Sequence, residues 1–194
     1  MKKFNNLFSL RWLVLEFWIA LVFLLSVNTQ AVAFKDESGE YALKAGFLYN
    51  FTQFIRWPEE TASLSDTFYA PFDFSLCVMG RDPFGDLLEV LADNLKAQGR
   101  PMNIIRLSMS DPWHECHILF VPKEENRNMK KILKKVASSP VLVIGEASSK
   151  GDLQPGISFL IKNDTIQFTI NKDAIKRSRL RVDSELLDIA LEVN

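Results

Sequence analysis

One short stretch holds most of the residues in this chain that could do chemistry. The sequence WHECHILFVP, residues 113–122, contains both histidines, His114 and His117, and one of the two cysteines, Cys116. Imidazole and thiolate are the usual zinc ligands, and a cysteine beside a histidine can act as a nucleophile. In an exported protein the same cysteine could form a disulfide with Cys77, the second cysteine. The choice depends on the compartment that the chain reaches.

The amino terminus has the pattern of a secretory signal peptide. Basic residues come first, the unbroken apolar run FWIALVFLLSV follows, and Ala-Val-Ala gives a small-x-small motif that ends at residue 33. The apolar run has about half of the ~20 residues that a membrane span needs, which disfavours a retained anchor. We expect residues 1–33 to be a cleaved signal peptide and residues 34–194 to form a soluble exported domain.

Length and charge limit the classes of protein to consider. Residues 34–194 are enough for one domain with a hydrophobic core and too few for two ordinary domains. The net charge is −1 at pH 7, without the basic excess typical of nucleic-acid-binding proteins. We therefore predict one domain with no nucleic-acid partner.

The chemistry-bearing residues must be positioned by helices and strands, and the first of these is a helix. Apolar periodicity predicts it over residues 40–57, with Ser38 as N-cap and Pro58 as the stop. The expected inward face consists of Leu43, Phe47, Leu48, Phe51, Phe54 and Ile55. Residues 59–70 show neither helical nor strand periodicity and are predicted to be a loop.

The rest of the chain alternates between strands and helices. A strand over residues 72–80 is followed by a helix capped by Asp82 and Pro83, whose inward face is Leu87, Leu88, Leu91 and Leu95. The later elements are strands at 102–107, 117–121 and 140–145, a helix at 124–137, a hairpin at 157–161 and 165–170, and a helix at 184–193. This order predicts an α/β fold, a single domain with a mixed β-sheet and helices on both faces.

The WHECH stretch favours a disulfide over a metal or a nucleophile. Its four candidate ligands are His114, Glu115, Cys116 and His117. Successive strand residues point to opposite faces, so at most two of the four face one way. Cys116 is not followed by a glycine elbow or a helix N-terminus that would lower the thiol pKa. An exported chain with an even number of cysteines, both in predicted strand segments, favours a Cys77–Cys116 disulfide. His114 and His117 are then expected at the surface or rim of the strand.

Two further sets of residues could support an enzyme or a nucleotide-binding protein. Residues 80–85, GRDPFG, occupy the position of a phosphate loop, but they lack the Lys-Ser/Thr of a P-loop and the G-x-G-x-x-G of a dinucleotide fold. Four carboxylates lie near predicted strand ends, but no motif pairs them with a base or a metal: Asp82, Asp86, Asp111 and Glu115. We predict no catalytic residues, no metal and no cofactor.

Basic residues cluster in two places. The lysines of residues 124–137 are most simply a solvated helix face. A denser run near the carboxyl terminus is a candidate partner-binding surface, because arginines are good anchors for carboxylates. The residues that we expect to bind a partner are Lys172, Arg177, Arg179 and Arg181.

Several segments, in their order along the chain, resemble the YfiR family of exported bacterial proteins. They are YALKAGFLYNFTQFIRWP, FSLCVMGRDPFGDLL, CHILFV, PVLVIGE, the hairpin GISFLI…IQFTIN, and RLRVDSELLDIALEV. They cover residues 41–193. No single segment is diagnostic, but the ordered set is specific.

The resemblance implies a periplasmic regulator and not an enzyme. Members of the family look like inhibitors that bind the periplasmic sensor region of a membrane-bound diguanylate cyclase, which lowers cyclic di-GMP and biofilm output. The resemblance also implies a homodimer and release from inhibition by an outer-membrane lipoprotein. Cys77 and Cys116 match a cysteine pair of the family, whereas the second pair of some relatives is absent here.

A second function remains open at this stage. The family is broad, and the protein could sense a small ligand and act on another membrane sensor, such as a histidine kinase. The aromatic residues of the first helix could line a ligand pocket, although core packing explains their spacing equally well.

Overall fold

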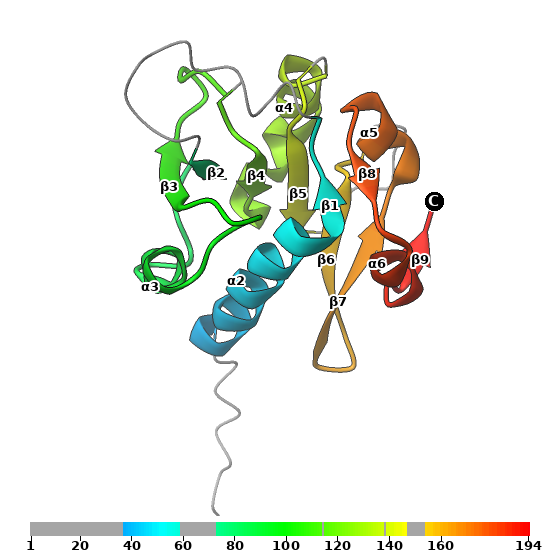
Figure 1. Ribbon diagram of the computed structural model, residues 1–194, viewed down its shortest axis with the longest axis horizontal. Coiled ribbons are helices and arrows are strands. Elements are labelled where there is room, and N and C mark those ends of the chain that lie inside the picture. The colour runs from blue at the N-terminus through cyan, green and yellow to red at the C-terminus, as the bar shows by residue number, and fades with distance from the viewer. Residues whose placement is uncertain (1–36, 59–72, 114, 138, 147–153) are drawn as a thin grey trace, which may run out of the picture. The chain divides into compact units, whose positions relative to one another are not determined.

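The computed structural model describes residues 37–58, 73–113, 115–137, 139–146 and 154–194 (Figure 1). The predicted signal peptide at residues 1–33, the predicted loop at 59–70 and His114 lie outside this part of the chain. The signal peptide therefore stays a prediction.

A mixed β-sheet of seven strands forms the centre of the described domain, in the order β3-β2-β4-β5-β6-β7-β9. The strands are β2 (Phe74–Met79), β3 (Met102–Leu107), β4 (Ile118–Val121), β5 (Leu142–Glu146), β6 (Ile157–Lys162), β7 (Thr165–Ile170) and β9 (Glu192–Val193). The first five in this order are parallel, β7 is antiparallel to β6, and β9 is parallel to β7. The predicted fold class is confirmed.

The sheet has a topological switch point between β2 and β4. The chain builds β3 on one side of β2 and then crosses to build β4, β5 and β6 on the other side. This is the doubly wound order in which the loops after the two central strands diverge and leave a crevice at their carboxyl ends. The sheet topology therefore marks one edge of the domain as the usual place for a ligand.

Helices cover both faces of the sheet (Figure 1). On one face, α2 (Glu37–Phe54), α3 (Leu87–Asn94) and α6 (Ser184–Asp188) pack on sheet side chains such as Leu76 and Phe120. On the other face, α4 (Met129–Lys135) packs on the alternate side chains of the same strands, including Leu119 and Val143. All four residues of β4 are buried, as expected for a parallel strand covered on both sides.

The first helix differs from its predicted form. It runs from Glu37, so Ser38 lies inside it and is not its N-cap, and it ends at Phe54. Ile55 and Arg56 form β1, which pairs with β8 (Arg181–Val182) in a separate two-stranded sheet. Leu43, predicted to face the core, is 61% exposed. Pairing with a strand more than a hundred residues away decides where this helix ends.

The helix after β2 also starts later than predicted. The Asp82 carboxylate accepts the Phe84 N–H at 2.7 Å, which forms a local turn and not a helix cap. Gly85, with φ of 59°, extends the irregular segment, and α3 begins only at Leu87. Leu95 follows the helix and does not belong to it.

The elements of the second half are confirmed with three changes. The predicted helix at 124–137 is a 3₁₀ helix, η2 (Lys123–Asn128), followed by α4. The basic run forms a short helix, α5 (Lys172–Arg177), that the sequence did not predict. The last predicted helix ends at Asp188, because the residues after it turn back and join the sheet as β9. The hairpin is confirmed, with Asn163 and Asp164 at φ of 51° and 55° in its two-residue turn.

Candidate functional site

The disulfide between Cys77 and Cys116 is present and confirms the prediction. Cys77 lies in β2 and Cys116 lies just before β4, the strand beside it, with the two Cα atoms 5.8 Å apart. Both residues are buried under α4. In this oxidised form Cys116 has no thiol to bind a metal or attack a substrate, so the bond excludes both alternatives for this cysteine.

His117 directly precedes β4 and is partly buried, consistent with the predicted rim of the strand, and specific contacts fix its ring there. Its Nδ1 accepts the Ser75 N–H at 3.1 Å, and its ring stacks on Phe74 with the centroids 4.6 Å apart. The Arg100 guanidinium lies 3.5 Å from Nε2. Burial, and then the charge of Arg100, lower the pKa of His117 to about 4. The neutral imidazole thus connects the chain before β4 to β2.

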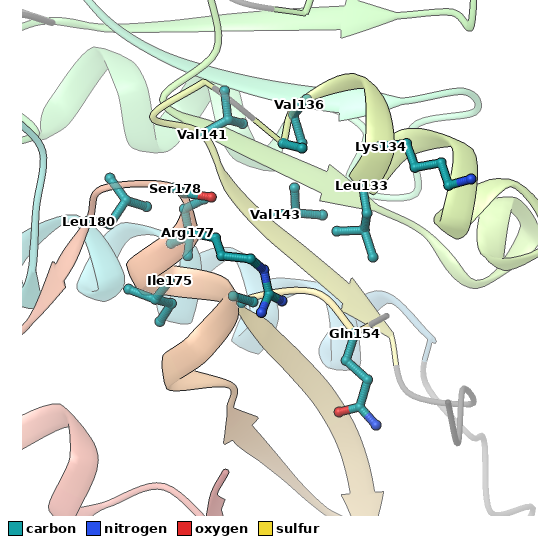
Figure 2. A pocket seen from close by; sticks show the side chains of 14 residues that line it. Leu133, Lys134, Val136, Val141, Val143, Gln154, Ile175, Arg177, Ser178 and Leu180 are labelled. Atoms are coloured by element: carbon teal, nitrogen blue, oxygen red, sulfur yellow. The ribbon is translucent and has the colours of Figure 1, made fainter. Parts of the chain in front are cut away.

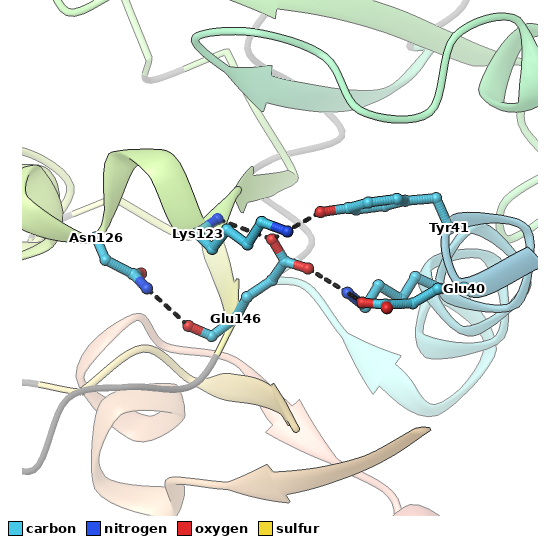
Figure 3. A network of polar contacts seen from close by, with 6 residues as sticks. Glu40, Tyr41, Lys123, Asn126 and Glu146 are labelled. Carbon is cyan, nitrogen blue, oxygen red and sulfur yellow. Dashed lines mark hydrogen bonds and ion pairs between the residues drawn. The ribbon is translucent and has the colours of Figure 1, made fainter. Parts of the chain in front are cut away.

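A buried polar network joins α2 to the end of β5 (Figure 3). Lys44, only 3% exposed, forms ion pairs with Glu40 on its own helix and with Glu146 at the end of β5. Glu146 also accepts hydrogen bonds from the Tyr41 hydroxyl at 3.2 Å and from the Lys123 N–H at 2.8 Å. Burial, and then the charge of Glu146, raise the pKa of Tyr41 well above its usual range.

The sequence does not indicate this network, because Lys44 looks like a solvated residue of an amphipathic helix. The spacing of Glu40 and Lys44, four residues apart, indicates only a surface ion pair. The buried third partner, Glu146, is 102 residues away from Lys44. The network fixes the amino-terminal half of α2 against the carboxyl end of the sheet.

A polar pocket of about 480 Å³ lies at the carboxyl ends of β2 and β4, where the sheet has its switch point. We call it the switch-point pocket. Its lining consists of Tyr41, Arg81, Asp82, Pro83, Phe84, Gly85, Leu87, Lys123 and Glu124. The GRDPFG loop thus lies where a ligand would bind in a doubly wound fold, although it lacks a nucleotide motif.

Arg81 and Asp82, the two charged residues of that loop, differ in whether their charge is free to bind a ligand. Asp82 forms an ion pair with Arg106 at 2.7 Å, so its charge is compensated inside the protein. The exposed Arg81 guanidinium forms no hydrogen bond or ion pair with any residue that the structure describes. Arg81 is therefore the side chain of this pocket best able to bind an anionic group.

A second, smaller pocket of about 180 Å³ lies between α4 and α5 (Figure 2). We call it the α4–α5 pocket. Ten of its fourteen lining residues are apolar or glycine: Leu133, Val136, Ala137, Val141, Leu142, Val143, Gly156, Ala174, Ile175 and Leu180. Lys134, Gln154, Arg177 and Ser178 complete the lining. The pocket is thus an apolar depression with one cation from each helix beside it.

The structure separates the four residues predicted to bind a partner. All four are exposed, but only Arg177 lines the α4–α5 pocket. Lys172 is at the start of α5, Arg179 follows the helix with φ of 58°, and Arg181 pairs with Arg56 between β8 and β1. The other basic residue that lines the pocket is Lys134, which the sequence predicted to be part of a solvated helix face. The role of the four residues in binding stays a prediction.

The carboxylates considered for catalysis have local structural partners or lie at the surface. The Asp111 carboxylate accepts hydrogen bonds from the Ser108 N–H and hydroxyl, which lower its pKa. Asp86 is exposed and precedes α3 without capping it through its side chain. Within the described ranges, no three His, Cys, Asp or Glu side chains are grouped so that they could hold a metal ion. No helix in the same ranges is long and apolar enough to cross a membrane.

Comparison with known families adds the observation that decides the identity. The family model described as YfiR/HmsC-like matches residues 41–191. The chain belongs to the YfiR/HmsC-like family. This membership confirms the resemblance found in the sequence. YfiR/HmsC-like proteins are periplasmic, and membership indicates a regulatory role in cyclic di-GMP signalling.

Proposed function

We propose that this protein inhibits a membrane-bound diguanylate cyclase by binding its periplasmic sensor region. The observation that carries the proposal is the family match over residues 41–191. The buried Cys77–Cys116 disulfide supports it, because such bonds persist in the oxidising periplasm and are rare in the cytosol. Inhibition would lower cyclic di-GMP and, with it, biofilm output.

Inhibition of this kind needs binding energy and no chemistry. An inhibitor changes the activity of its partner only by the difference in its affinity for the active and inactive conformations. A shift of the partner from 1:99 to 99:1 requires a difference of about 5.5 kcal/mol. A homodimer could supply it through two copies of one surface, and an outer-membrane lipoprotein that sequesters the inhibitor would reverse the effect.

Cellular cyclic di-GMP measures the proposed function directly. We expect deletion of the gene to raise its level and expression of the full chain to restore it. The matched control is a chain without residues 1–33, which would stay in the cytoplasm and leave the level high. A Cys77→Ser chain is expected to restore the level less well and to accumulate less, because the disulfide stabilises the fold. No rise on deletion would contradict the cyclase proposal.

A second candidate function is the sensing of a small ligand, with action on another membrane sensor such as a histidine kinase. The switch-point pocket favours it, since about 480 Å³ falls within the range of small-molecule sites. The test is the melting temperature of the purified protein with a panel of small carboxylates, phosphates and nucleotides. A stabilising compound should lose its effect in Arg81→Ala. A panel without any stabilising compound counts against a ligand of these classes.

A further inference from the structure

We infer that the α4–α5 pocket anchors an acidic segment of a protein partner, which inserts one apolar side chain between Lys134 and Arg177. The inference extends the proposed function, because it takes this partner to be the regulated signalling protein. It rests on the size of the pocket, its lining and the charge around it.

The size of the α4–α5 pocket suits a side chain better than a metabolite. Its volume of about 180 Å³ is below the ~300 Å³ at which small-molecule sites begin. The recessed surface comes from apolar side chains such as Leu133, Val143 and Ile175 (Figure 2). At protein interfaces, one apolar or aromatic residue buried in such a depression commonly carries much of the binding energy.

The charge on both sides of the pocket selects an acidic partner. The seven residues of α4 include four lysines and no acid, and residues 172–181 carry five basic side chains and one acid. The whole chain nevertheless has a net charge of −1, so positive charge is concentrated on these two segments. Complementary charge of this kind speeds encounter and fixes orientation.

Lys134 and Arg177 are the two cations available at the pocket itself. Neither side chain forms an ion pair or hydrogen bond with the residues that the structure describes. Lys135, on the same helix, is already used within the fold: its ammonium lies 3.8 Å from the centre of the Trp113 ring and donates to the Asp111 carbonyl at 3.1 Å. Carboxylates of a bound segment would pair with Lys134 on one side and Arg177 on the other.

A protein segment fits this surface better than a membrane. Proteins that lie on membranes insert protruding apolar side chains into the lipid. The large apolar side chains that are exposed in the described residues are Leu43, Val90, Ile161, Ile189 and Leu191, and none of them is on α4 or α5. The apolar surface between these helices is recessed, which suits an incoming side chain.

Synthetic peptides test the inference on the purified protein. The probes are two fluorescent ten-residue peptides rich in Asp and Glu, one with a central Phe and one with a central Ala. We expect the Phe peptide to bind about tenfold more tightly, because burial of one large side chain contributes more than 1.4 kcal/mol. Equal affinities, no measurable binding, or stronger binding to vesicles containing anionic phospholipid would each overturn the inference.

Charge reversals locate the binding site. Lys134→Glu with Arg177→Glu should weaken binding of the Phe peptide at least tenfold. The control, Lys131→Glu with Lys176→Glu, makes the same change in charge at exposed positions of the same two helices that do not line the pocket. Equal losses in both variants would indicate diffuse electrostatic attraction and would refute the site.

A variant that fills the pocket tests its apolar lining independently of its two cations. Ala137 is exposed and lines the pocket, so Ala137→Trp can occupy the depression without disturbing the core. We expect this variant to melt like wild type and to bind the Phe and Ala peptides equally. A retained preference for Phe would show that the anchor lies elsewhere.

Cellular cyclic di-GMP distinguishes this inference from the proposed function. If the wild-type chain lowers the level, the Lys134→Glu/Arg177→Glu chain should fail and the Lys131→Glu/Lys176→Glu chain should succeed at equal abundance. Full activity of the first variant would refute the docking site without contradicting the inhibitor proposal. If the wild-type chain itself has no effect, the inhibitor proposal fails, and the peptide affinities decide the docking site alone.

Discussion

Protonation of His117 should destabilise the protein at mildly acidic pH. The imidazole is neutral in the folded state, where Nδ1 accepts the Ser75 N–H, the ring stacks on Phe74 and the Arg100 guanidinium lies beside Nε2. A proton on Nδ1 would remove this acceptor and place a second positive charge beside Arg100. The effect of pH on stability should therefore depend on whether residue 117 is a histidine.

The size of the effect follows from the two pKa values. The pKa of His117 is about 4 in the folded state, and an unperturbed histidine has a pKa of 6.5. The unfolded chain binds the proton more tightly, so stability is complete above pH 6.5 and falls as the pH drops toward 4. Between about pH 7.5 and about pH 5, linkage gives a loss of about 2 kcal/mol in the free energy of unfolding.

Urea unfolding at these two pH values measures this loss. At about pH 5 most ordinary carboxylates are still ionised, so they contribute little to the difference. His114 is the other histidine, and a His114→Gln background leaves His117 as the only one. In that background we expect the loss of about 2 kcal/mol, and adding His117→Gln should remove most of it. An equal loss in both variants would refute the assignment to His117.

Three further predictions concern stability, each measured by urea unfolding. The double variant Cys77→Ala/Cys116→Ala should lose at most about 4 kcal/mol of unfolding free energy, because the disulfide joins cysteines 39 residues apart. Wild type with reductant should show the same loss, and an unchanged urea midpoint would contradict a stabilising role for the disulfide. Lys44→Met should lower the free energy of unfolding by about 3 kcal/mol, because it leaves the Glu146 carboxylate buried without its cation. Adding Glu146→Gln should recover part of this loss, and a further loss would contradict the role of the buried ion pair. Asn171 is the N-cap of α5 and its side chain accepts the Ala174 N–H at 2.9 Å, so Asn171→Ala should lower the free energy of unfolding by about 1 kcal/mol. Asn171→Asp should have almost no effect, and equal losses in the two variants would exclude a capping role.

The sequence by itself determined the fold class and the disulfide. Short apolar runs such as residues 118–121 favour strands buried on both sides, and their alternation with helical segments favours helices on both faces of the sheet. With export expected from the amino-terminal pattern, two cysteines had few chemical options, so Cys77 and Cys116 could be paired before their positions were known. These inferences succeeded because local periodicity and composition carry them.

Tertiary structure alone decided the burial of Lys44 and His117. Each looks like a solvated residue in sequence. Lys44 is buried because Glu146, from a distant segment, compensates its charge, and His117 is partly buried with Nδ1 accepting the Ser75 N–H. The end of α2 likewise depends on pairing with residues 181–182. Local sequence cannot show such pairings, because the partners meet only when the chain is folded.

The two pockets also belong to the tertiary structure. The GRDPFG loop became part of a candidate ligand site only when the strand order placed it at the switch point. Arg177 was expected to act with Arg179 and Arg181, yet the fold sets it across an apolar depression from Lys134. The sequence could count these charges, but their placement follows from the packing of α4 and α5 on either side of the pocket.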